Sequence, residues 1–144
     1  WKWVTDPENP DFWEKAIAWE SSRQMQYLHD FLAAIEWWKL EPAHELIRNQ
    51  PDDITRRMVL AKVAGRDFAV AYLPDNDAIE VNLSAFSAPL APRWFDPVRG
   101  RSSPMTARIP NEGDQRFAPP AKGDWVLVIE RAAEGVGSPK TQSK

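Results

Sequence analysis

The chain has 144 residues, of which 43% are hydrophobic, and a formal net charge of −3. This length leaves room for one ordinary domain, or for one domain and a fragment of another, and the hydrophobic content is enough for a buried core. The weak negative charge gives no reason to expect nucleic acid or an anionic membrane as a partner. Cysteine is absent, which excludes disulfides and thiolate chemistry. No apolar run approaches the roughly 18–20 residues of a membrane span.

The distribution of tryptophan suggests two halves of different character. Six of the eight tryptophans fall within the first thirty-eight residues. The sequence also begins at Trp1, with neither an initiator Met nor a signal-type segment. We therefore expect it to be a piece of a longer protein.

Two helices are expected before Pro42. Asn9-Pro10 supplies an N-cap residue and a favoured first helical residue, which predicts a short helix over about residues 10–18. Ser21 and Gln24 have the spacing of a capping box and predict a second start. This second helix should be amphipathic and about four turns long, with an apolar stripe of Met25, Leu28, Leu32 and Ile35. The stripe needs a partner surface.

The segment Arg57–Leu83 predicts an antiparallel meander of three strands. Phe68, Val70 and Tyr72 alternate with Ala69, Ala71 and Leu73, and Ile79, Val81 and Leu83 alternate with Glu80 and Asn82, as in half-buried strands. We expect Phe68, Val70 and Tyr72 to fill the core together with Ile79, Val81 and Leu83. Turn-forming residues at Gly65–Asp67 and Pro74–Asp77 separate the three strands.

Further strands are expected on both sides of this meander. The candidates are Leu46–Arg48, Arg93–Phe95, Met105–Ile109, Gln115–Phe117 and the continuous apolar run Asp124–Glu130. Such a run fits a strand that is covered on both faces. Seven or eight short strands without intervening helices predict a mainly β fold, an antiparallel β-sandwich preceded by an N-terminal helical segment. We expect a helical segment over 1–42, the sandwich over 43–132 and a flexible tail over 133–144.

The sequence offers no catalytic constellation and no cofactor site. His29 and His44 are the only histidines, and no cysteine could assist them as metal ligands. Asp75-Asn76-Asp77 resembles the start of a calcium loop but lacks the glycine and the final glutamate, so a plain turn is favoured. No nucleophile elbow and no phosphate-binding glycine loop occur. We therefore expect no catalytic residue, no bound metal and no cofactor.

Binding is the chemistry that the residues leave open. Four arginines lie around Trp94 and Phe95 in sequence: Arg93, Arg99, Arg101 and Arg108. Arginine beside an aromatic ring can bind acidic or planar groups. The candidate ligand-binding set consists of Arg93, Trp94, Arg99 and Arg101. The competing interpretation, which we favour, makes Trp94 a core residue and the arginines a solvated rim.

The ordered pattern resembles a known family. The segment from Gln24-Met25 to Trp37-Trp38-x-Leu40-x-Pro42 is similar to the last helix of an apiosidase-like glycoside-hydrolase TIM barrel. The landmarks that follow are Phe68-x-Val70-x-Tyr72-Leu73-Pro74, Val81-x-Leu83, Trp94-x-Asp96-Pro97-x-x-Gly100, Phe117-x-Pro119-Pro120 and Asp124-Trp125-Val126-Leu127-Val128. They resemble the β-sandwich known as the putative collagen-binding domain of a collagenase. The similarity spans about residues 10–131.

The resemblance implies a division of labour. The catalytic carboxylates of a bacterial parent enzyme, expected to be a glycoside hydrolase, would lie upstream of Trp1, at positions that this sequence does not contain. The sandwich would be a non-catalytic accessory domain that packs on the barrel and contacts glycan. The alternative is a module that binds collagen or a similar matrix polymer. Either role implies a secreted protein, extracellular or periplasmic, with polysaccharide or collagen as partner.

Overall fold

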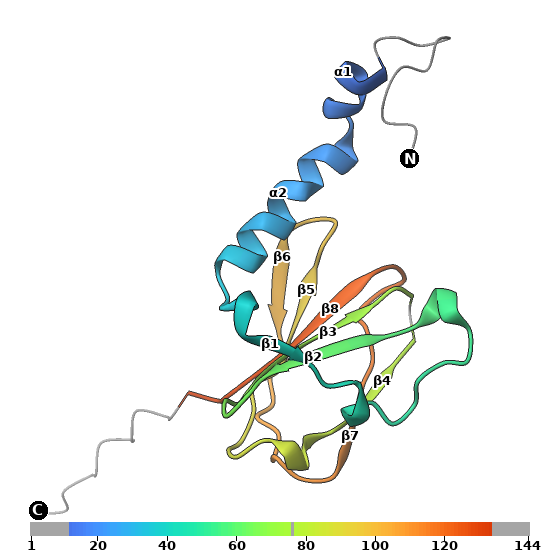
Figure 1. Cartoon of the computed structure of the whole chain (residues 1–144). Coiled ribbons are helices and arrows are strands. Elements are labelled where there is room, and N and C mark those ends of the chain that lie inside the picture. The colour runs from blue at the N-terminus through green and yellow to red at the C-terminus, as the bar shows by residue number, and fades with distance from the viewer. Residues whose placement is uncertain (1–11, 76, 134–144) are drawn as a thin grey trace, which may run out of the picture.

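The computed structural model describes residues 12–75 and 77–133, and it is mainly β (Figure 1). Its two α-helices are α1 (Phe12–Ile17) and α2 (Glu20–Ala33), followed by a short 3-10 turn, η1 (Trp37–Lys39). The strands are β1 (Leu40–Pro42), β2 (Val59–Val63), β3 (Phe68–Leu73), β4 (Ile79–Asn82), β5 (Arg93–Asp96), β6 (Arg101–Pro104), β7 (Asp114–Phe117) and β8 (Trp125–Glu130).

The strands form two antiparallel sheets on opposite sides of one core. The larger sheet has six strands in the order β1-β2-β3-β8-β5-β6, and the smaller sheet pairs β4 with β7. Ile79 and Val81 of β4 and Phe117 of β7 join Leu60 and Leu127 of the larger sheet in a single buried cluster. The predicted antiparallel sandwich is confirmed.

The predicted three-stranded meander is wrong in its third strand. β2 pairs with β3, but β3 pairs on its other side with β8 over six residues, from Phe68↔Glu130 to Leu73↔Trp125. The loop after Leu73 carries the chain across the core, so that β4 pairs with β7. The apolar run of β8 pairs along the whole of β3, while β4 supplies the second layer that the core needs.

The other predicted strands have mixed outcomes. Strands are present at the positions predicted around Trp94, Arg116 and Leu127. The segment 44–46 is instead a 3-10 turn, η2 (His44–Leu46), and Ile47 makes only an isolated bridge to Val81. The strand predicted over 105–109 lies earlier, as β6, because Gly100 closes the hairpin directly after β5.

The core uses the smaller side chains of β3. Ala69, Ala71 and Leu73 are fully buried, whereas Tyr72 on the opposite face is 39% exposed. Phe68 and Val70 accompany Tyr72 on this outer face and pack against Val126 and Val128 of β8. The expectation that Phe68, Val70 and Tyr72 fill the sandwich core is therefore wrong, because their face turns toward α2.

The helical segment agrees with the prediction in outline. α2 begins at Glu20, one residue before the predicted cap, and Trp19 at the N-cap position makes no side-chain capping bond. The hydroxyl of Ser22 instead donates a 2.6 Å hydrogen bond to the Ala16 carbonyl, which joins the two helices. The predicted first residues of α1 at 10–11 and nearly all of the predicted tail, 134–144, lie outside the described residues.

Candidate functional site

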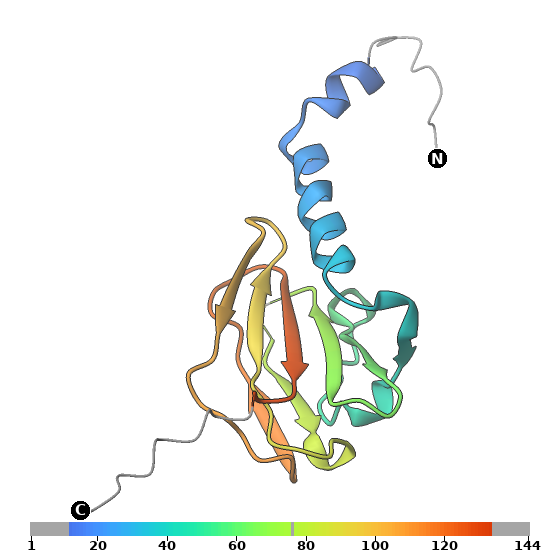
Figure 2. The ribbon, with the colours of Figure 1, turned by 90° about the vertical axis from the view of Figure 1, so that its left-hand side faces the viewer.

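The C-terminal half of α2 packs against the outer face of the larger sheet near the β5–β6 hairpin, and its N-terminal half projects beyond the sheet (Figure 2). The Phe31 ring stacks on the Phe95 ring with centroids 4.5 Å apart. One turn earlier, Tyr27 lies over the hairpin glycine, so closely that a Cβ added to Gly100 would be 2.6 Å from Tyr27 Cδ1. The spacing of four residues places Tyr27 and Phe31 on one helix face.

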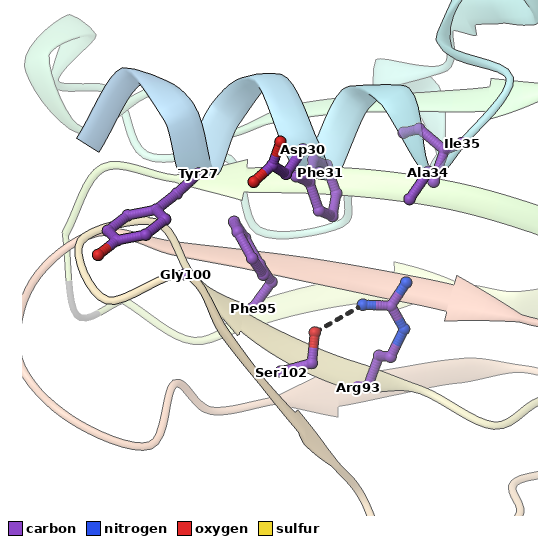
Figure 3. A pocket seen from close by; sticks show the side chains of 9 residues that line it. All are labelled: Tyr27, Asp30, Phe31, Ala34, Ile35, Arg93, Phe95, Gly100 and Ser102. Carbon is purple, nitrogen blue, oxygen red and sulfur yellow. Dashed lines mark hydrogen bonds between the residues drawn. The ribbon is translucent and has the colours of Figure 1, made fainter. Parts of the chain in front are cut away.

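Beside this contact is a cavity of about 340 Å³ (Figure 3). It is lined from α2 and the residues after it by Tyr27, Asp30, Phe31, Ala34 and Ile35, and from the hairpin by Arg93, Phe95, Gly100 and Ser102. Its walls are therefore mainly apolar, with a carboxylate, a guanidinium and a hydroxyl among them.

Arg93 is the polar centre of this region. Its Nη1 donates to Ser102 Oγ at 3.1 Å, and its Nε donates to Glu130 Oε1 at 3.3 Å. The side chain is 23% exposed. These two contacts hold the guanidinium in place while it faces the cavity.

A second cavity of about 250 Å³ adjoins the first and shares Ala34, Ile35 and Arg93 with it. Its other lining residues are Glu36, Val63, Arg66, Phe68 and Glu130. Glu36 pairs with Lys39 and with Arg66. The hydrogen bond from Lys39 is the main reason that the pKa of Glu36 lies below its ordinary value, and the charge of Arg66 adds to this effect.

Only one of the four sequence-predicted binding residues lines these cavities. Arg93 does, but Trp94 is 4% exposed and packs edge-on against Trp125 in the core, with ring centroids 6.2 Å apart. Arg99 pairs with Asp96 at 2.8 Å, and Arg101 extends from the edge strand β6 into solvent. The favoured interpretation of Trp94 as a core residue agrees with this burial.

The β5–β6 turn is held by a buried carboxylate. Asp96 Oδ1 accepts hydrogen bonds from the backbone N–H groups of Val98 and Arg99, at 2.9 and 3.0 Å. Burial acts to raise the pKa of Asp96, but the hydrogen bonds and the charge of Arg99 outweigh it, so the pKa lies below its ordinary value. This turn presents Gly100 to Tyr27.

Sequence reasoning missed most of the cavity. Tyr27, Phe31, Phe95 and Ser102 were not among the candidates, although the four-residue spacing of Tyr27 and Phe31 was visible. The sequence did not reveal which face of α2 meets the sheet, because Met25 and Leu28 of the predicted apolar stripe lie away from that face.

A second surface stands out on the helical segment. Six large apolar side chains are each between 46% and 64% exposed; we call them the exposed apolar set, Ile17, Trp19, Met25, Leu28, Trp37 and Trp38. Met25 and Leu28 lie roughly 140° and 80° around α2 from the middle of the face, formed by Tyr27 and Phe31, that contacts the sheet. The predicted stripe is thus divided: Met25 and Leu28 are exposed, whereas Leu32 and Ile35 are half-buried and Ile35 lines both cavities.

Among the residues that the structure describes, no group of three or more His, Cys, Asp or Glu side chains could hold a metal ion. No helix in this part of the chain is long and apolar enough to cross a membrane.

The fold is an antiparallel β-sandwich domain with a helical segment attached to its larger sheet. The chain belongs to the family described as "Putative collagen-binding domain of a collagenase", whose model matches residues 42–130, more than half of the sequence. No curated protein matches the chain.

Solved structures of glycoside hydrolases share the fold. One titled "Glycoside hydrolase" superposes with a TM-score of 0.73 at 19% identity, covering 85% of this chain and 28% of its own. A glycoside hydrolase family 5 protein from Bacteroides vulgatus ATCC 8482 gives a TM-score of 0.73 at 17% identity, covering 88% of this chain and 28% of its own. At these identities the likeness establishes the fold alone.

Both structural matches extend beyond the sandwich into the helical segment. Residues 42–144 make up only about 72% of the chain, so each match must also include part of residues 1–41. The chain spans less than a third of the length of either glycoside hydrolase structure.

Proposed function

We propose that this chain is a non-catalytic accessory domain of a longer, exported glycoside hydrolase, and that it packs on the catalytic barrel and contacts glycan. The observation that carries the proposal is the exposed apolar set on a helical segment that is itself fixed to the sandwich. The helix has one face on the sheet and offers another to a neighbour.

The exposed apolar set is unusual for a free surface. α2 contains no buried residue, and the T-shaped pair of Trp37 and Trp38 is more than half exposed. Clustered exposed apolar side chains of this kind mark interaction surfaces. Tryptophan is also among the residues that most often dominate interface energies.

The upstream barrel is the occupant that we propose for this surface. The two glycoside hydrolase structures retain about 72% of their length outside the region that matches this chain. A preceding domain of the same chain would be tethered next to the helical segment, so a modest contact would be sufficient to dock it.

Calorimetry of the longer parent protein tests the docking. Leu28→Glu and Trp38→Glu should separate one joint unfolding transition into two, because each places a charge in the contact. Gln26→Glu, which adds a charge at an exposed polar position of the same helix, should leave the transition joint. A joint transition that survives both apolar-to-Glu changes would refute the contact.

We propose that the isolated chain has no hydrolase activity of its own. The purified chain should release no reducing sugar from any polysaccharide that its parent degrades. Hydrolysis by the isolated chain would overturn the accessory role.

The second candidate is binding to collagen or a similar matrix polymer. It is favoured by β6, an edge strand whose four residues are all exposed and whose Arg101 side chain makes no hydrogen bond or ion pair with the described residues. A pull-down on triple-helical collagen tests this role, and the double variant Arg99→Ala plus Arg101→Ala probes whether the arginines take part. If collagen retains the wild-type chain but not the double variant, the result would support the matrix role over glycan contact.

A further inference from the structure

We propose that the cavity between α2 and the β5–β6 hairpin binds one ring of a neutral saccharide, with Arg93 as its anchor. This inference deepens the glycan-contact part of the proposed function and does not depend on the barrel contact. None of the exposed apolar set lines the cavity.

The apolar part of the cavity suits the C–H face of a sugar. Phe31 and Phe95 are held together by their stacking, and Tyr27 is fixed over Gly100. Ile35 lies further along the same helical segment, just beyond the end of α2, and belongs to the same lining (Figure 3). A wall that is already packed loses little conformational entropy when a ligand binds.

The polar part offers both donors and acceptors. A guanidinium has five N–H donors, and Arg93 uses two of its nitrogens for Glu130 and Ser102, which leaves donors for a ligand. Asp30 contributes a carboxylate to the same cavity, and its Oδ1 is 3.1 Å from His29 Nδ1. Sugar hydroxyls donate and accept, so one ring can satisfy both groups at once.

The charges favour a neutral ligand over an anionic one. Asp30 balances Arg93 in the first cavity, and Glu36 and Glu130 balance Arg66 and Arg93 in the second. A uronate or a phosphate would bring its charge close to Asp30 and Glu130 without a free excess of cations. Like-charge contacts of this kind discriminate strongly against a ligand.

The dimensions fit a small ligand that extends in one direction. A volume of 340 Å³ lies at the lower end of the roughly 300–1,000 Å³ range of small-molecule sites. The second cavity continues beyond Arg93, so a further ring could follow the first.

The test is an NMR titration of the whole 144-residue chain with cello-, xylo- and mannotriose, and with a trimer of galacturonate. At least one neutral trisaccharide should bind with a Kd of about 1 mM, shifting the amide signals of Arg93, Phe95 and Ser102. Ala34→Leu fills the space shared by both cavities and should raise that Kd at least about tenfold.

Ala33→Leu is the matched control, because Ala33 is exposed on the same turn and lines neither cavity. It should leave the Kd within about a factor of two. Ser102→Ala, which removes one support of Arg93 on an exposed edge strand, should weaken binding more mildly. Thermal unfolding verifies that all three variants fold.

Three results would overturn the proposal. They are no shift with any neutral trisaccharide at about 10 mM, tighter binding of the galacturonate trimer, or equal affinity in Ala34→Leu and Ala33→Leu. Leu28→Glu should leave saccharide binding unchanged, which separates failure of this site from failure of the barrel contact.

Discussion

Asp96 couples the stability of the β5–β6 turn to pH. Its folded-state pKa is lowered, so its contribution to stability is fully present above the ordinary value of 3.8 and is lost as the pH falls through the folded pKa. The wild-type chain should therefore lose more stability between about pH 5 and pH 2 than Asp96→Asn does.

Urea unfolding at a series of pH values measures this difference. Asp96→Asn keeps an oxygen for the N–H groups of Val98 and Arg99 but loses the charge that pairs with the Arg99 guanidinium. Parallel pH profiles for the two proteins would show that the carboxylate charge is not involved.

Gly100 is required both for its backbone conformation and for the space that Tyr27 occupies, and a comparison with Gly65 separates these two effects. Both have positive φ, +64° and +68°, but an added Cβ meets Tyr27 only at Gly100 and meets nothing within 4 Å at Gly65. Gly65→Ala should cost about 1–2 kcal/mol of unfolding free energy, the backbone term alone. Gly100→Ala should cost clearly more.

Chemical denaturation of both variants gives the comparison. Adding Tyr27→Ala to Gly100→Ala should recover the excess, because the clash is with that ring. An equal loss in the two alanine variants would show that α2 tolerates displacement from the hairpin.

The element that joins helix and sandwich is α2, and Phe31 is its main anchor. Phe31→Ala removes the stack on Phe95 and should destabilise the helix contact by about 1–3 kcal/mol, since the site is only partly buried. Leu28→Ala, on the exposed face, should change stability by no more than about 0.5 kcal/mol.

Hydrogen exchange locates the effect. Phe31→Ala should speed amide exchange throughout α2 while the amides of β3 and β8 stay protected. Loss of protection in β8 as well would mean that the helix and the sheet unfold as one unit.

Local patterns in the sequence predicted most elements but not how they pair. The alternation around Phe68 and the apolar run at Leu127 indicated strands correctly, because a period of two is a local property. The pairing of β3 with β8 joins residues more than fifty positions apart, and no local signal specifies it. Adjacent strands often pair, which is why the meander was the natural prediction and was wrong.

The candidate site was less predictable than the fold. Arg93 was found because arginine near an aromatic is a recognisable pattern, yet Trp94 beside it points into the core. Successive residues of a strand face opposite sides, so a cluster in sequence is divided by the sheet. The α2 residues that line the cavity with Arg93 depend on how the helix docks on the sheet. The predicted apolar stripe does not indicate that docking, because Met25 and Leu28 of the stripe are exposed.

At the scale of the whole molecule, stability should concentrate in the middle of the larger sheet. Leu127 is fully buried on β8, so Leu127→Ala should cost about 2–5 kcal/mol and lower the melting temperature of the sandwich. Val59→Ala, on a strand nearer the sheet edge and 45% exposed, should cost well under 1 kcal/mol. Differential scanning calorimetry of the two variants checks the contrast, and similar losses would contradict it.

The position of β8 has a consequence for synthesis on the ribosome. Among the residues that the structure describes, β8 is the last strand in the chain, yet it lies between β3 and β5 and connects them. Until residues 125–130 have emerged from the exit tunnel, β1-β2-β3 and β5-β6 are separate fragments of the larger sheet, and the edges of β3 and β5 that β8 will join are unpaired. We therefore expect the larger sheet to remain unassembled through most of its translation. Folding of the sandwich should be a late event that follows the emergence of β8.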